Sequence, residues 1–149
     1  MKGHVVSEKS AVAYELSEDD IKREEAFLAD VPFLNWGAFF MAPIWGIAHG
    51  DWPAILFYPL WIFCDNLVYS AWGNPTGASI TLAVVTLVIM ALVMVGYARV
   101  SSPRAAHRAA AAGYTLKQYL QRERRWAVGM ALIAVAMLIL ATWYNLCIR

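Results

Sequence analysis

The sequence predicts an all-α membrane protein with three transmembrane helices, and three observations lead to this fold class. Hydrophobic residues make up 60% of the 149-residue chain and charged residues only 15%, whereas soluble domains are roughly half apolar and a quarter charged. The charge gathers in two segments. Residues 1–32 hold four basic and eight acidic residues, and residues 99–125 hold seven basic residues and one acidic residue. Long apolar segments follow each of them, as in integral membrane proteins.

The acidic N-terminal segment, 1–32, predicts one surface helix. Ser17 is a suitable N-cap, and the three acidic residues after it suit the positive end of a helix dipole. Pro32 requires the helix to end near Ala29, because the residue before a proline avoids the α conformation. Ile21 and Leu28 lie on one side of this helix, which predicts a weakly amphipathic helix against the membrane surface.

The aromatic segment 33–50, FLNWGAFFMAPIWGIAHG, predicts a short helix that begins at Trp36 after an Asn35 cap and ends at Gly50. Small residues at intervals of four form one stripe, which is typical of a face that docks against a neighbouring helix: Ala38, Ala42, Gly46 and Gly50. Its length of about 25 Å is short against a hydrocarbon core of ~30 Å. We therefore expect an interfacial or re-entrant helix, although a tilted helix in a thinned bilayer would still cross.

Three later segments have the length and composition of membrane spans. They cover residues 53–72, 78–98 and 126–148, and the second contains no charge over 21 residues. Pro59 predicts a bend in the first span. The sequence GNPTG at 73–77 predicts a tight turn between the first and second spans.

The basic linker 99–125 predicts a helix that Gly113 ends and Thr115 restarts, with Gln118 completing a capping box. Leu116, Tyr119 and Leu120 form an apolar face, so this is a basic amphipathic linker helix. We expect it to contact anionic lipid headgroups and not nucleic acid, because no groove-reading motif is present. The expected lipid contacts are Lys117, Arg122, Arg124, Arg125 and Trp126.

The basic residues also predict the orientation of the chain. By the positive-inside rule the linker 99–125 is cytoplasmic, and the 73–77 turn and the C-terminus lie outside. If the aromatic segment does not cross the membrane, the acidic N-terminal segment is cytoplasmic as well. A reporter at the N-terminus that is active only outside the cell would contradict this.

The run NWGAFFMAPIWG at 35–46 resembles a family of small bacterial membrane proteins that is labelled as a domain of unknown function. In that family a core N-W-x-A-F-F-x-x-P-x-W precedes two or three spans, and the resemblance covers about residues 25–98. Many members continue with a basic, tyrosine-containing turn, where this chain has GIAHGDW. The resemblance implies a bacterial inner (cytoplasmic) membrane and brings no catalytic residue with it.

Asp65 is the one acidic residue predicted near the middle of a span, where ionisable residues are costly and usually functional. Counting ~1.5 Å per residue from the outer ends of the helices places Asp65 about 10 Å deep, Thr86 about 12 Å and Thr142 about 9 Å. Together with Asn66 these residues predict an intramembrane polar layer. The layer would serve either as a protonatable relay or ion site, or as a hydrogen-bonded contact that sets helix register.

The remaining polar residues predict no catalytic group, metal site or cofactor. His49 and Asp51 flank a glycine at a helix corner, where they would pair, bind a metal, sense pH or, as we prefer, cap the adjoining helices. Two ligands are too few for zinc, and no histidine is predicted inside the membrane to hold a haem. The sequence contains no nucleophile elbow, P-loop or zinc-protease motif.

Two functional hypotheses follow from these patterns. The first is a non-enzymatic membrane protein that works by helix association, either as a homo-oligomer or as a subunit beside a membrane partner protein. The second is a small oligomeric carrier or channel component that uses Asp65 for proton or ion coupling. An enzyme is the least supported class, because hydrolysis normally needs two or more cooperating groups.

Overall fold

The computed structural model describes residues 18–148, which form helices and short connections with no β-strand among them. Three of the helices are long and apolar enough to cross a membrane: Trp52–Gly73 (η1 with α4), Gly77–Ala111 and Leu116–Cys147. The prediction of an all-α membrane protein with three transmembrane helices is confirmed. In chain order the elements are α1 (Glu18–Ala29), α2 (Trp36–Phe40), α3 (Ala42–Ala48), the 3-10 helix η1 (Trp52–Leu56), α4 (Phe57–Gly73), α5 (Gly77–Ala111) and α6 (Leu116–Cys147).

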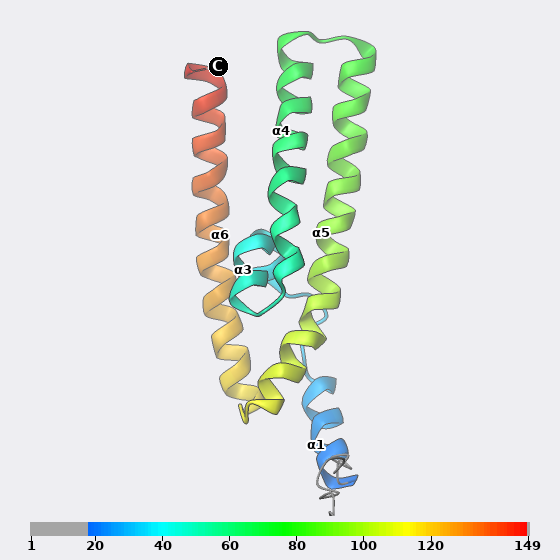
Figure 1. Cartoon of the computed structure of the whole chain (residues 1–149), viewed down its shortest axis with the longest axis vertical. Helices are drawn as coiled ribbons and strands as arrows, with labels where there is room; N and C mark the ends of the chain where they lie inside the picture. The colour runs from blue at the N-terminus through cyan, green and yellow to red at the C-terminus, as the bar shows by residue number, and fades with distance from the viewer. Residues whose placement is uncertain (1–17, 149) are drawn as a thin grey trace, which may run out of the picture.

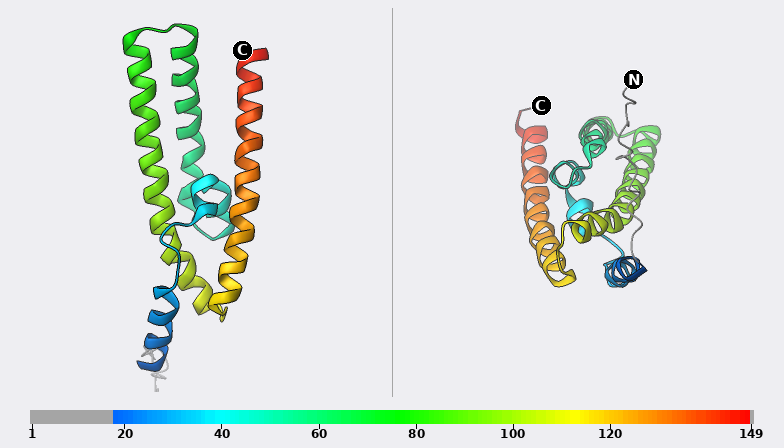
Figure 2. Two further views of the ribbon diagram at one scale, coloured as in Figure 1. Left: turned by 180° about the vertical axis from the view of Figure 1, so that it is seen from behind. Right: turned by 60° about the horizontal axis from the view of Figure 1, so that its bottom comes forward.

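The three long helices run side by side (Figure 1). The turn between α4 and α5 and the end of α6 lie at one end of the molecule, while α1 and the turn between α5 and α6 lie at the other. The short helices α2 and α3 lie among α4, α5 and α6, closer to the second end (Figure 2). The aromatic segment therefore lies between the long helices, and it does not form a fourth long helix beside them.

The aromatic segment is two helices and not the single helix predicted. The chain breaks at Met41, which has φ −143° and ψ 65° and separates α2 from α3. Pro43 explains the break, because it lies in the first turn of α3, where its missing N–H would have no intrahelical partner in any case. The predicted cap is confirmed: the Asn35 side chain accepts a hydrogen bond from the Ala38 amide at 3.0 Å. Gly50 ends the segment with φ +77°, as a C-terminal glycine does.

The first span begins with a 3-10 turn, η1, and continues as α4. Pro59 is the third residue of α4 and so lies in its first turn, where the missing proline N–H disrupts no hydrogen bond. Pro59 thus lies near the start of the first span, and the bend predicted at this proline stays a prediction.

The basic linker does not form a helix of its own, because both flanking helices extend into it. The helix α5 continues from the second span to Ala111 and contains Pro103, which cannot donate to the carbonyl one turn earlier. The lower part of α5 bends towards α6 (Figure 1). The predicted restart is confirmed: Thr115 and Gln118 form a capping box, and α6 then runs without a break into the third span.

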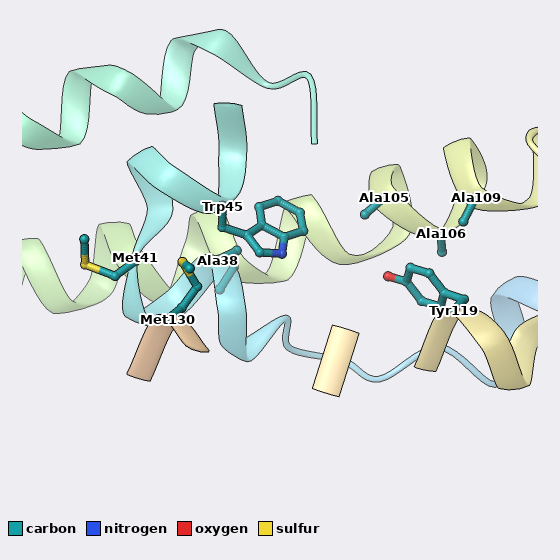
Figure 3. Close-up of a cluster of buried hydrophobic side chains, with 9 residues drawn as sticks. Ala38, Met41, Trp45, Ala105, Ala106, Ala109, Tyr119 and Met130 are labelled. Carbon is teal, nitrogen blue, oxygen red and sulfur yellow. The ribbon is translucent and has the colours of Figure 1, made fainter. Parts of the chain in front are cut away.

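The buried apolar side chains form one cluster that extends from α2 and α3 to the contact between α5 and the start of α6 (Figure 3). We call this part of the molecule the inner junction. It consists of α2, α3, residues 98–111 of α5 and residues 116–130 of α6. Its buried apolar residues are Ala38, Met41, Trp45, Ala98, Ala105, Ala106, Ala109, Tyr119 and Met130. Alanines on α5 lie beside Tyr119 of α6, and the wide Trp45 ring of α3 is fully buried.

The rest of the long helices, residues 60–93 and 131–147, is called the outer region. Most of its large apolar side chains are exposed in the isolated chain, and only 6% of the most apolar stretch of α6 is buried. Such a surface is what lipid tails or other membrane helices cover.

Candidate functional site

The inner junction contains a buried polar cluster centred on Glu123 of α6. One carboxylate oxygen, Oε2, accepts hydrogen bonds from Asn35 Nδ2 at 2.7 Å and from Trp45 Nε1 at 3.1 Å. The other, Oε1, lies 3.1 Å from His49 Nε2. The side chains of His49 and Glu123 are only 7% and 12% exposed. Three residues of the aromatic segment thus converge on the single acidic residue of the basic linker.

The hydrogen bonds of His49 indicate its protonation state. Nδ1 lies 2.8 Å from the Trp45 carbonyl, which can only accept, so Nδ1 carries a proton. Nε2 faces Glu123, so a second proton lies between the imidazole and the carboxyl group. The His49 ring stacks on Trp45 with centroids 4.1 Å apart, and an imidazolium is favoured over the face of an indole ring. The arrangement is that of a buried, hydrogen-bonded His49–Glu123 pair.

Electrostatics at Glu123 agree with this assignment. Burial alone raises the pKa of the carboxyl group, but hydrogen bonds from His49, Asn35 and Trp45, together with the charge on His49, leave the pKa lower than its ordinary value. Tyr119, one turn earlier on α6, has a raised pKa because it is buried and lies near the Glu123 charge. Glu123 therefore stays ionised, and Tyr119 stays neutral, at neutral pH.

Local sequence explains how the aromatic segment presents these donors. Asn35 uses its side-chain oxygen to cap α2 and its NH₂ group to reach Glu123. A Cβ atom at Gly37 would lie 2.6 Å from Trp45 Cδ1, so only glycine lets the indole pack there. The backbone N–H of Asn35 donates to the Ala98 carbonyl at 3.1 Å, which joins the start of α2 to α5.

The corner residues His49 and Asp51 have different partners from each other. His49 is the C-cap of α3, and its ring bonds a carbonyl of the last turn, in addition to Glu123. Asp51 precedes η1 but makes no side-chain capping bond, so that part of the capping prediction is wrong. Its carboxylate instead accepts a hydrogen bond from Tyr97 of α5 at 2.9 Å. A Cβ atom at Gly46 would lie 2.7 Å from Tyr97 Oη and would overlap Ala54, so this contact depends on glycine.

Asp65 of α4 is bonded to α6, but by a residue that the predicted polar layer did not include. Asn145 Nδ2 donates to Asp65 Oδ1 at 2.9 Å. Thr142, one turn earlier on α6, is exposed, and Thr86 is half-buried on α5. Asn66 turns away and donates to the Ile62 carbonyl of its own helix at 2.8 Å. Asp65 thus bonds a side chain of α6, and its partner there is Asn145.

The other predicted contact residues are distributed as follows. Ala38, Ala42 and Gly46 are buried within the inner junction, and Gly50 is exposed at its corner. The break at Met41 divides these four between α2, α3 and the corner, so they do not form one helical stripe. The predicted lipid contacts all lie on the first part of α6, where Lys117, Arg124 and Arg125 are exposed and Arg122 and Trp126 are half-buried.

The Glu123 cluster is arranged for holding elements together and offers little for catalysis. Both ring nitrogens of His49 are occupied by acceptors, which leaves neither one to take a proton from a substrate or to bind a metal. Among residues 18–148 no three histidine, cysteine or acidic side chains lie together as a metal site would require. What the cluster does is join α2 and α3 to α6.

Sequence reasoning missed Glu123, although the sequence contains a signal for it. Leu116, Tyr119 and Glu123 follow at intervals of three and four residues, so the acid continues the apolar face of α6 and leaves the basic face. A lone carboxylate on an apolar face needs buried donors. Asn35, Trp45 and His49 supply them.

Comparison with known proteins gives no relative for this chain. No family model, no curated protein and no solved structure matches it.

Proposed function

We propose that this protein is a non-enzymatic component of the bacterial inner membrane that works by association of its membrane helices, either with further copies of itself or with a partner subunit. The inner junction fixes the fold, and the outer region provides the associating surface. Support comes from the contrast between the two: polar groups in the junction are bonded internally, while apolar side chains of the outer region are largely uncovered.

One observation in the outer region carries the proposal. Asn145 bonds Asp65 through its NH₂ group only, and its carbonyl oxygen Oδ1 is buried without a hydrogen-bond partner within residues 18–148. An unpaired amide oxygen inside a membrane is unfavourable, and such groups on transmembrane helices commonly bond across helix–helix contacts. This oxygen is covered within the isolated chain, so a donor from a second chain would reach it only if α4 or α6 shifts on association.

The experiment is to count copies of the tagged protein in native-membrane nanodiscs by single-molecule photobleaching, and to identify what co-purifies. The proposal predicts a fixed assembly of more than one chain, or one stoichiometric partner. Asn145→Leu removes the polar group and should lower the assembled fraction. Thr142→Val, one turn away on an exposed site, is the matched control and should leave it unchanged. A wild-type monomer without a partner would contradict the proposal.

The proposed orientation has the basic linker in the cytoplasm. The positive-inside rule counts lysines and arginines and depends little on acidic residues, so the seven basic residues of 99–125 support this orientation. Reporter fusions at both termini test this: activity of the N-terminal fusion only inside and of the C-terminal fusion only outside is expected.

The second candidate function is a proton- or ion-coupled carrier or channel component, and the Asp65–Asn145 hydrogen bond within the span favours it. Proteoliposomes that contain the purified protein would then show a flux that Asp65→Asn abolishes. Absence of flux together with a fixed assembly would favour helix association.

A further inference from the structure

The first half of α6 has a second face beside the one that carries Glu123. Tyr119, Glu123, Trp126 and Met130 follow at intervals of four, three and four residues and point into or along the inner junction. Gln118, Arg122, Arg125 and Gly129 follow at the same intervals, one residue earlier, so they form a parallel stripe about 100° around the helix. One face of α6 is thus acidic and buried, and the next is basic and open.

The open face is hollowed. A groove of about 430 Å³ is lined by Gln118, Arg122, Arg125, Trp126, Gly129 and Met130, among others. A second hollow beside it shares Arg125 and Gly129 and adds Arg124. No acidic residue lines either hollow, because Glu123 is engaged with His49 on the other face. Arg122 and Arg125 therefore have no acidic partner in the groove that they line.

The groove is polar at one end and apolar at the other. Arg122 and Arg125 lie towards the α5–α6 turn, whereas Gly129 lies about 6 Å beyond Arg125 and about 10 Å beyond Arg122 along the helix at 1.5 Å per residue. Arg122 packs over the Tyr114 ring, 5.6 Å from its centroid, which restricts where its guanidinium lies. A Cβ atom at Gly129 would meet nothing within 4 Å, so the missing side chain keeps the apolar end open.

We propose that this groove binds one anionic phospholipid, with its phosphodiester headgroup on Arg122 and Arg125 and the start of an acyl chain beside Gly129. Guanidinium groups bind phosphate oxygens in a bidentate manner, and amide groups such as that of Gln118 add neutral donors. A tryptophan at the same level suits the headgroup boundary of a bilayer. This site is independent of helix association, which involves the outer region.

The test is native mass spectrometry of the full chain in detergent with added phosphatidylglycerol or phosphatidylcholine. Wild-type protein should retain one phosphatidylglycerol in preference to phosphatidylcholine. Replacing both arginines, Arg122→Gln with Arg125→Gln, should weaken retention about 25-fold, from the usual contribution of a basic residue at an anionic membrane. The lysine pair, Arg122→Lys with Arg125→Lys, keeps the charge and should recover part of the affinity.

Two further variants separate this site from general surface charge. Lys117→Gln with Arg104→Gln removes the same charge away from the groove that Arg122 and Arg125 line, and should have little effect. Gly129→Leu changes no charge but fills the apolar end, and should lower retention by about threefold or more. Equal losses in the Lys117 and Arg104 control, or no loss with Gly129→Leu, would overturn the proposal. Displacement of the lipid by millimolar inorganic phosphate would also overturn it, because the site would then be one for free phosphate.

Discussion

At the inner junction one carboxylate binds three side chains that lie 74 to 88 residues earlier in the chain, whereas in the outer region one asparagine makes one bond between α4 and α6 and leaves its own oxygen unpaired. The junction contains most of the buried apolar side chains, and the outer region contains few. The chain is therefore held together by its own contacts at the inner junction. In the outer region, most apolar side chains are left for lipid or other helices to cover.

The largest expected effect is that of removing the Glu123 carboxylate. Glu123→Ala leaves the donors of Asn35 and Trp45 unpaired and His49 buried without its partner, and breaking a buried ion pair in this way costs about 3–5 kcal/mol. Thermal unfolding of the protein in detergent, followed by circular dichroism, should show a large loss of stability. The control is Glu25→Ala on the exposed face of α1, which should unfold like the wild type. Equal unfolding of Glu123→Ala and wild type would refute the role given to this cluster.

A smaller effect is expected from overfilling the corner of the junction. Gly46→Ala introduces a Cβ atom that overlaps Ala54 and lies 2.7 Å from Tyr97 Oη, and overpacking of this kind costs about 1–3 kcal/mol. The same unfolding assay measures it. Gly96→Ala, where a Cβ atom meets nothing within 4 Å, should instead be neutral or slightly stabilising. If Gly46→Ala and Gly96→Ala change the stability by the same amount, close packing at Gly46 does not stabilise the corner.

Acid should weaken the junction less than deletion of the side chain does. The pKa of Glu123 is lowered in the folded protein, so its contribution to stability is present above the ordinary value of 4.5 and is lost as pH falls through the folded-state pKa. A protonated carboxyl group still accepts from Asn35 and Trp45, which limits the loss. Unfolding temperatures should therefore begin to fall below about pH 4.5, and Glu123→Gln should lack this part of the pH dependence. A pH profile identical in both proteins would contradict the assignment.

The smallest effect on stability is expected in the outer region. Asn145→Leu removes the hydrogen bond to Asp65, and side-chain hydrogen bonds within membranes contribute about 0.6 kcal/mol on average. The unfolding temperature should hardly change, while the assembled fraction in nanodiscs should fall. A loss of stability as large as that of Glu123→Ala would remove the distinction between the two regions.

Some of this organisation could be predicted from the sequence, because it depends on local signals. The three long apolar helices follow from composition and length, and the caps at Asn35 and Thr115 follow from short-range hydrogen bonding. The positive φ at Gly50 follows from the same kind of local rule.

The rest depends on how distant elements meet. Pro43 explains why the aromatic helix is interrupted, but the position of α2 and α3 among α4, α5 and α6 depends on contacts between segments far apart in the chain. Counting residues from helix ends gave Thr142 as the partner level for Asp65, but the relative shift of α4 and α6 brings Asn145 there instead. Glu123 received no role from the sequence, because an acidic residue in a basic helix is ordinarily a solvated surface charge. Only the position of Glu123 on the apolar face of α6 distinguishes it from an ordinary surface charge.

The most direct test of the central claim is a distance measurement between α3 and α6. Spin labels at the exposed positions Ala48→Cys and Gln121→Cys, with Cys64→Ala and Cys147→Ser to remove the native thiols, report on the inner junction by double electron–electron resonance. If the Glu123 cluster holds α3 against α6, the distance distribution is narrow in the wild type, broadens with Glu123→Ala and stays narrow with Asp65→Asn. A distribution that remains narrow without the Glu123 carboxylate would contradict it.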